Sequence, residues 1–171
     1  MTIESLEDGT TVYLFKRTNP LIERNVNLEY SLDNGETWNT YTLPGTGENG
    51  ESITINLGEK VLFKGDNPEG FNECYYDNKY INNLAYYFLG TGKYKVSGNV
   101  MSLIYKDNFI DKNNTPNKGC FSRLFQGNTA LIEVYNLCLP EPTNDGYEDY
   151  CIFIECTNLQ KVTLDYFPKS L

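Results

Sequence analysis

Three carboxylates near the end of the chain come closest to a catalytic arrangement of residue types and spacing. Glu148 and Asp149 lie between Tyr147 and Tyr150, and Glu155 follows shortly after. Two carboxylates that flank a glycosidic bond are the arrangement that glycosidases use. Acidic residues are common throughout the chain, however, so the pattern favours a solvated surface over a glycosidase site.

The absence of histidine narrows the chemistry further. The 171 residues include no histidine, 14 Lys and Arg, and 23 Asp and Glu, which gives a net charge of −9. Without an imidazole, Ser-His-Asp and Cys-His catalysis and most zinc hydrolase sites are excluded. The negative charge disfavours binding to phosphate backbones and to anionic membrane surfaces. We therefore expect no enzymatic activity, no cofactor and no nucleic-acid partner.

A short run of Asp and Asn offers a possible metal site. Asp107, Asn108 and Asp111 could supply oxygen ligands to calcium. The run lacks the glycine and the terminal glutamate at EF-hand spacing. The sequence therefore predicts no metal site at this position.

The chain has an odd number of cysteines and no CxxC spacing. Small apolar thiols suit a packed interior, and four of the five lie in or beside the repeats described below. We therefore expect buried free thiols, which favours a reducing compartment at synthesis. These cysteines are Cys74, Cys120, Cys138, Cys151 and Cys156.

The length of the chain is that of one ordinary domain or two small ones. Residues 1–9, MTIESLEDG, have neither the basic region nor the apolar region of a signal peptide. No apolar run approaches 18 residues, so we expect no membrane insertion.

The first half of the chain predicts short strands separated by turns. Runs rich in Thr, Val, Ile, Tyr and Phe alternate with Gly, Asp and Asn, which is typical of an antiparallel β-sandwich. We therefore predict a sandwich-like module over residues 1–95. The predicted hairpins pair 2–6 with 10–16, 26–32 with 38–43, and 52–57 with 60–64, and residues 84–89 and 93–96 are predicted as two further strands. The polar segment 65–83 predicts a long connection, in which Tyr75 and Tyr76 are candidate binding residues.

One of these turns carries a recognisable motif. Residues 31–38, SLDNGETW, fit the pattern SxDxGxTW and resemble the Asp-box of sialidases and other propellers. Asp33 can accept hydrogen bonds from turn amides, and Gly35 can adopt a positive φ. A sialidase would need several copies of the motif. We therefore interpret Ser31, Asp33, Gly35 and Trp38 as a structural turn.

The last third of the chain contains an internal repeat. Residues 124–140 align with 152–168 without a gap at an offset of 28 residues (152 − 124). A period of this length is typical of leucine-rich repeats, in which each unit contributes a strand and a short helix or turn. The residue pattern over 119–125 is compatible with a helix. Such units bury their apolar face only against a neighbouring unit.

The repeat also predicts a register. Parallel stacking at this offset would place Glu133 beside Lys161 on the exposed face. Tyr135, two residues after Glu133, is a further binding candidate on that face, together with the charged pair. The pairs expected to point inward are Leu131 with Leu159, and Val134 with Val162. We therefore predict a leucine-rich-repeat segment of about two units over residues 96–171.

Several segments together resemble the BspA-like leucine-rich-repeat proteins of Bacteroides-type gut bacteria and their phages. The segments are 3–11 (IESLEDGTT), 30–38 (YSLDNGETW), 97–103 (SGNVMSL) and 120–131 (CFSRLFQGNTAL). The resemblance implies a β-rich module that ends in a strand of the type GN-(I/V)-MSL and is followed by repeats. It also implies adhesion and recognition without catalysis. The chain departs from the family where Asn128 replaces a common cysteine, where Glu148 replaces the cysteine seen as Cys120, and in having two units only.

The resemblance, together with the features above, sets the expected function. We expect a non-enzymatic virion surface or fibre-type component of a phage, which contacts other structural proteins or the host surface and forms a homo-oligomer. The alternative is a carbohydrate- or protein-binding adhesion domain on a bacterial cell surface. Its partners would then be a host-surface protein or a glycan.

Overall fold

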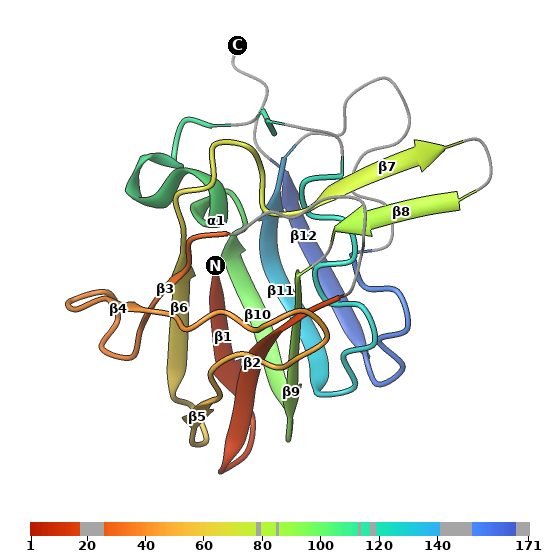
Figure 1. Ribbon diagram of the computed structural model, residues 1–171. Helices are drawn as coiled ribbons and strands as arrows, with labels where there is room; N and C mark the ends of the chain where they lie inside the picture. The colour runs from red at the N-terminus through yellow and green to blue at the C-terminus, as the bar shows by residue number, and fades with distance from the viewer. Residues whose placement is uncertain are drawn as a thin grey trace.

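The computed structural model describes residues 1–17, 26–77, 80–84, 86–112, 114–116, 119–140 and 152–166, and it is mainly β, as predicted (Figure 1). The strands of the first half are β1 (Thr2–Ser5), β2 (Thr10–Lys16), β3 (Glu29–Ser31), β4 (Asn39–Thr40), β5 (Ile53–Ile55), β6 (Lys60–Lys64), β7 (Glu73–Asp77) and β8 (Tyr80–Leu84). Those of the second half are β9 (Tyr86–Thr91), β10 (Tyr94–Asn99), β11 (Leu131–Leu139) and β12 (Lys161–Tyr166). A short helix α1 (Ser102–Tyr105) and the 3₁₀ turn η1 (Lys106–Asn108) follow β10.

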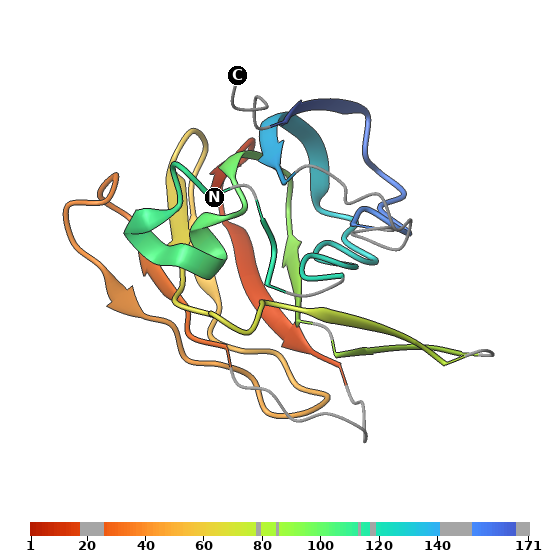
Figure 2. The same ribbon diagram turned by 90° about the horizontal axis from the view of Figure 1, so that it is seen from above.

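The largest sheet has seven strands in the order β12-β11-β10-β1-β6-β3-β4. Its strands β10, β11 and β12 are parallel, whereas the other pairs are antiparallel. The sheet is therefore mixed: its described strand pairs within the first module are antiparallel, as predicted, and its parallel pairs join β10 to the two repeat strands. Figures 1 and 2 place β12 and β4 at opposite sides of the molecule. A second sheet has three strands in the order β5-β2-β9.

The predicted strands are present, but two of the three predicted hairpins are wrong. β1 and β2 lie in different sheets, as do β5 and β6, and β9 and β10. The turns between these strands carry the chain from one sheet to the other, as at the corner of a sandwich. Only the pair formed by β3 and β4 is confirmed as a hairpin.

The three corner turns are joined to one another. Gly9, Gly58 and Gly92 each have a positive φ, of 69°, 78° and 79°, which glycine adopts without steric cost. The backbone N–H of Ser5 donates to the carbonyl of Glu59 at 3.0 Å. These contacts close one end of the two layers.

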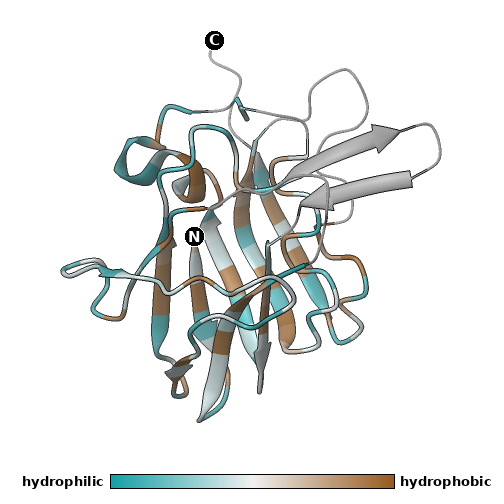
Figure 3. Ribbon diagram, viewed as in Figure 1, coloured by the Kyte–Doolittle hydropathy of each residue, from teal (hydrophilic) through white to brown (hydrophobic). Residues whose placement is uncertain are grey.

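The core lies between the two sheets. Alternate residues of β2 are buried, namely Thr10, Val12 and Leu14, because successive side chains of a strand point to opposite faces and one face of β2 is turned to the core. Figure 3 shows the resulting alternation of apolar and polar residues along the strands. Phe63 of β6 and Phe88 of β9 meet across the layers with ring centroids 5.0 Å apart.

Two segments differ from the sequence prediction. The predicted connection 65–83 contains β7 and β8, which pair as an antiparallel hairpin that extends away from the two larger sheets (Figure 1). Residues 119–127 form successive turns and no helix, and Gly127 has a φ of 70°. Within the described residues, no helix is long and apolar enough to cross a membrane.

The two 28-residue repeats contribute neighbouring parallel strands, β11 and β12. Their preceding turns also stack, since the backbone N–H of Phe125 donates to the carbonyl of Ile152 at 2.9 Å, and the rings of Phe125 and Phe153 are 5.7 Å apart. The predicted boundary at residue 95 falls inside β10, which pairs with β1 on one side and β11 on the other. Independent folding of the two parts stays a prediction.

Candidate functional site

A row of alternating charges crosses the outer face of the seven-stranded sheet. Register partners connect the row from β6 through β1, β10 and β11 to β12. Its members are Lys60, Glu4, Lys95, Glu133 and Lys161. Because their side chains are at least partly exposed, this face of the sheet is turned to solvent. We refer to these five residues as the charge row.

Neighbours in the charge row form ion pairs. The Nζ atoms of Lys95 and Lys60 lie 2.9 Å and 3.5 Å from carboxylate oxygens of Glu4. Partial burial opposes ionisation of Glu4, but hydrogen bonds and charge from the two lysines lower its pKa. The Nζ of Lys161 lies 3.1 Å from Oε1 of Glu133. The sheet therefore presents a balanced polar surface, although the whole chain is acidic.

The residues predicted for the exposed face of the repeats lie together at the β12 end of this row. Glu133 and Lys161 are register partners, in the predicted parallel alignment. Tyr135 is 49% exposed, and Lys161 Nζ lies 5.8 Å from the centroid of its ring. These three side chains combine both charges and an aromatic surface, which suits binding to a polar partner.

The inner-face residues of the two repeats are register partners but differ in exposure. Val96, Val134 and Val162 occupy equivalent positions on β10, β11 and β12, so Val134 and Val162 stack as predicted. Val96 and Val134 are fully buried, whereas Val162 is 48% exposed. Val162 is exposed because, within the described residues, β12 pairs with β11 alone. Leu131 is buried and Leu159 is partly buried.

Tyr75 and Tyr76 lie apart from these residues. The structure places both on β7, opposite Asn82 and Ile81 of β8, and not in an irregular connection. The β7–β8 hairpin belongs to neither of the larger sheets. The structure therefore does not bring the two predicted binding regions into one sheet.

The Asp-box segment forms a closed turn between β3 and β4. Asp33 accepts hydrogen bonds from the Thr37 backbone N–H at 2.9 Å and from the Thr37 hydroxyl at 2.6 Å. The backbone N–H of Gly35, which has a φ of 94°, donates to the Ser31 hydroxyl at 2.8 Å. The indole N–H of Trp38 donates to the Gly35 carbonyl at 3.1 Å. The four residues therefore act on the turn itself.

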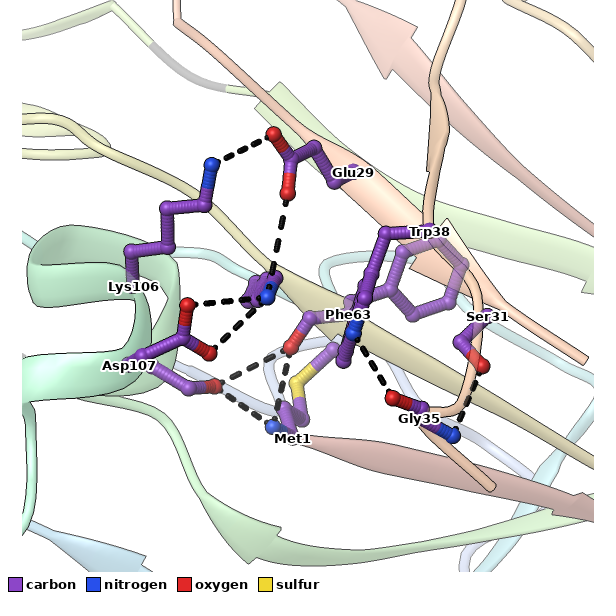
Figure 4. Close-up of polar contacts among 10 residues, drawn as sticks. Met1, Glu29, Ser31, Gly35, Trp38, Phe63, Lys106 and Asp107 are labelled. Carbon is purple, nitrogen blue, oxygen red and sulfur yellow. Dashed lines mark hydrogen bonds and ion pairs between the residues drawn. The ribbon is translucent and has the colours of Figure 1, made fainter. Parts of the chain in front are cut away.

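Trp38 also covers a buried lysine, which the sequence analysis missed (Figure 4). Lys64 is 7% exposed, and its Nζ lies 3.9 Å from the centroid of the Trp38 ring. The same nitrogen donates to both carboxylate oxygens of Asp107, at 2.8 Å and 3.0 Å. Glu29 joins Lys64 to Lys106, since its two oxygens lie 3.9 Å and 2.7 Å from the respective amines. We call these five residues the lysine cluster.

A pocket of about 220 Å³ borders the lysine cluster and is also lined by Met1, Ser102 and Asn99. The nitrogen of Met1 donates to the Phe63 carbonyl at 3.1 Å and to the Ser102 hydroxyl at 2.6 Å. Lys64 is held by its carboxylate partners. The arrangement stabilises the junction of β6 with α1.

The lysine cluster could not be predicted from the sequence, because its members are far apart in the chain. Glu29, Lys64 and Asp107 come from β3, β6 and η1. The Asp-box could have indicated an aromatic ring folded over its own hairpin. No spacing in the sequence, however, reports which strand will lie beside the hairpin.

We expect Asp33→Asn to destabilise the protein in a pH-dependent manner. Hydrogen bonds from the side chain and backbone of Thr37, and from Ser31, lower the pKa of Asp33 to about 2, from an ordinary value of 3.8. The ionised form therefore stabilises the folded state above about pH 4, and this contribution disappears as the pH falls toward 2. Urea unfolding of the native protein and of Asp33→Asn should differ at pH 7 and converge at low pH. Asp111→Asn serves as a control, and a difference that persists at the lowest pH would contradict this assignment.

The alternative chemistries receive little support from the described residues. Asp107, a candidate calcium ligand, is engaged by Lys64, and the part of the chain that is described contains no group of three or more metal-ligating side chains. Glu155 is exposed and accepts a hydrogen bond from Gln126 at 3.1 Å. Glu148 and Asp149 of the glycosidase alternative lie outside the described residues.

Three of the cysteines are described in detail, and they are free thiols. Cys120 is buried, whereas Cys138 and Cys156 are partly buried. Burial raises the pKa of the Cys138 and Cys156 thiols, which keeps them protonated and poorly reactive. The free thiols agree with the prediction at these three positions, but of the three only Cys120 is fully buried as predicted. The side chains of Cys74 and Cys151 lie outside the described part.

Comparison with protein-family models, with curated proteins and with solved structures finds no match to this chain.

Proposed function

We propose that this chain is a non-catalytic structural and recognition protein, which serves as a virion surface or fibre-type component of a phage. The observation that carries the proposal is the change in exposure along the parallel strands. Val162 on β12 is 48% exposed at the position where Val96 and Val134 are fully buried. A half-exposed apolar residue on the last strand of a stack is what a contact with another protein would cover.

The outer face beside this edge supports the same proposal. Glu133, Tyr135 and Lys161 present charge and aromatic surface on neighbouring strands. Tyrosine is favoured in binding surfaces because it offers a large contact area and a polar tip at low entropic cost. The surface has the features of a contact for a protein partner, and its charge is balanced between acidic and basic groups.

The chemistry of the chain supports a role without catalysis. The sequence supplies no histidine, and the carboxylates of Asp107 and Glu4 are bound to lysines, whereas that of Asp33 is bound within its turn. These ion pairs and hydrogen bonds stabilise the fold. The resemblance to BspA-like leucine-rich-repeat proteins adds the expectation of a phage or cell-surface setting.

Immunolabelling of phage particles tests the proposed location. Antibodies against the purified chain should label intact particles of a phage that encodes it, because a surface component is accessible without disruption. Uninfected host cells serve as the control. Particles that remain unlabelled, when the same antibodies detect the chain in infected cells, would contradict a virion role.

An adhesion domain that binds carbohydrate on a bacterial surface is the second candidate. The projecting β7–β8 hairpin favours it, since that hairpin carries Tyr75 and Tyr76 on a strand that lies outside the two larger sheets. A glycan array discriminates between the two functions. Selective glycan binding that is lost in Tyr75→Ala or Tyr76→Ala, but retained in Tyr135→Ala, would favour the adhesion domain.

A further inference from the structure

Strand β12 has a pattern that is complementary to itself. Residues 161–165 read Lys-Val-Thr-Leu-Asp, so that a cation, an apolar residue, a threonine, an apolar residue and an anion follow one another. Lys161, Thr163 and Asp165 are exposed on the outer face of the sheet. Val162 and Leu164 lie at the intervening inner positions. Read backward, the strand has the same pattern with its charges exchanged.

We propose that β12 pairs antiparallel with the β12 of a second copy of this chain, about an axis at Thr163. Directly opposite residues in an antiparallel pair lie on the same face of the sheet. In this register Lys161 faces the second copy's Asp165, and Val162 faces the second copy's Leu164. Because the axis is two-fold, each of these contacts occurs twice. The pairing joins the two seven-stranded sheets edge to edge.

The contacts of β12 within one chain leave these groups available. Its only ladder partner among the described strands is β11. Asp165 forms no ion pair with the described residues, whereas Lys161 pairs with Glu133 on one side and is still 62% exposed. Val162 is 48% exposed. The pairing would supply a partner for the carboxylate and cover the apolar side chain.

Other registers satisfy the same residues less well. A slip of one residue would place the outward Lys161 opposite the inward Leu164, which mismatches the two faces. A slip of two residues would place Lys161 opposite a threonine and leave Asp165 without its cation. A two-fold interface requires a self-complementary surface, and only the register about Thr163 matches both charges at once. A second copy of the chain is therefore the occupant that the strand fits.

Charges on an edge strand can also prevent pairing, and the experiment must separate the two roles. Sedimentation velocity over a wide concentration range should show a reversible dimer of the native chain. Its affinity should be modest, because one strand edge buries less area than a standard interface. Asp165→Lys places like charges opposite each other at both ends of the pair. We expect it to raise the dissociation constant about tenfold or more.

A mixing experiment tests the register directly. Lys161→Asp and Asp165→Lys should each dimerise poorly alone, whereas an equimolar mixture should form a heterodimer with two restored charge pairs. Asp111→Lys, which makes the same charge change outside β12, should leave the dimer unaffected. Thermal unfolding of each variant confirms that it is folded. Hydrogen exchange should show protection of the β12 amides at high concentration of the native chain only.

This inference rests on the proposed role of the β12 edge in assembly, but the two can fail separately. A native chain that stays monomeric at every concentration overturns the β12 pairing, and so does a dimer that Asp165→Lys leaves unchanged. Either result leaves the labelling of phage particles intact as a test of location. Unlabelled particles together with a β12-dependent dimer would overturn the virion role and retain the pairing.

Discussion

Replacement of Asn128 by alanine should lower the free energy of unfolding by about 2–5 kcal/mol. Asn128 is 1% exposed, and its Oδ1 accepts hydrogen bonds from the backbone N–H groups of Ala130 and Leu131, at 3.1 Å and 3.0 Å. Its Nδ2 donates to the Phe88 carbonyl at 2.7 Å and to the Tyr94 hydroxyl. Alanine would leave these buried groups without a partner, and each unpaired group costs about 1–3 kcal/mol.

Urea unfolding at pH 7 measures this loss, with Asn158→Ala as the matched control. Asn158 is exposed, although its Nδ2 also donates to a backbone carbonyl, that of Thr129, at 2.8 Å. Water can replace that hydrogen bond, so Asn158→Ala should lower the free energy of unfolding by less than about 1 kcal/mol. If both substitutions lowered the free energy of unfolding equally, the buried hydrogen bonds of Asn128 would contribute no more to stability than those of an exposed amide.

A second large effect is expected for Phe88→Ala, which should lower the free energy of unfolding by about 3–5 kcal/mol. Phe88 is 1% exposed on β9, and its ring meets that of Phe63 on β6 at 5.0 Å. It also stacks on Phe71, with ring planes 5° apart and centroids at 6.1 Å, and meets Phe125 at 5.8 Å. Removal of the ring would open a cavity at the point where both sheets and the repeat turns meet.

Phe153→Ala provides the comparison for this substitution. Phe153 is only partly buried and stacks on Phe125 at 5.7 Å. Since solvent can enter the space left by the Phe153 ring, we expect Phe153→Ala to lower the free energy of unfolding by less than Phe88→Ala does. Chemical denaturation of both variants checks the order, and a larger loss at Phe153 would contradict the central position of Phe88.

Strand positions could be predicted from the sequence, because they depend on local alternation and turn residues. The predicted runs 10–16 and 60–64 coincide with β2 and β6. Pairing could not be predicted in the same way. Asp8-Gly9 is a hairpin signal, yet its turn connects two sheets. Whether β1 pairs with β2 or with another strand depends on neighbours that are distant in the sequence, such as β10. Only the Asp-box turn, which closes through its own side chains, gave the right pair.

The same contrast applies to the candidate site. The offset of 28 residues was enough to predict that Glu133 and Lys161 are register partners, because the repeat carries long-range information within the sequence itself. The exposure of Val162 could not be predicted in the same way, because the offset does not report whether a further strand lies beside β12. The connection around Tyr75 and Tyr76 was predicted as irregular because its Asn and Asp residues are typical of loops, although β7 and β8 pair there.

The position of β1 in the middle of the large sheet has a consequence for the order of folding. β1 lies between β6 and β10, and Thr2 is the register partner of Leu62 and of Ser97. Since the ribosome adds residues in sequence order, β1 leaves it long before either neighbouring strand is made. Contacts of such sequence separation slow folding, because loop closure precedes the gain from pairing. Chains released before residue 99 should therefore hold β1 with an unpaired edge and depend on chaperones.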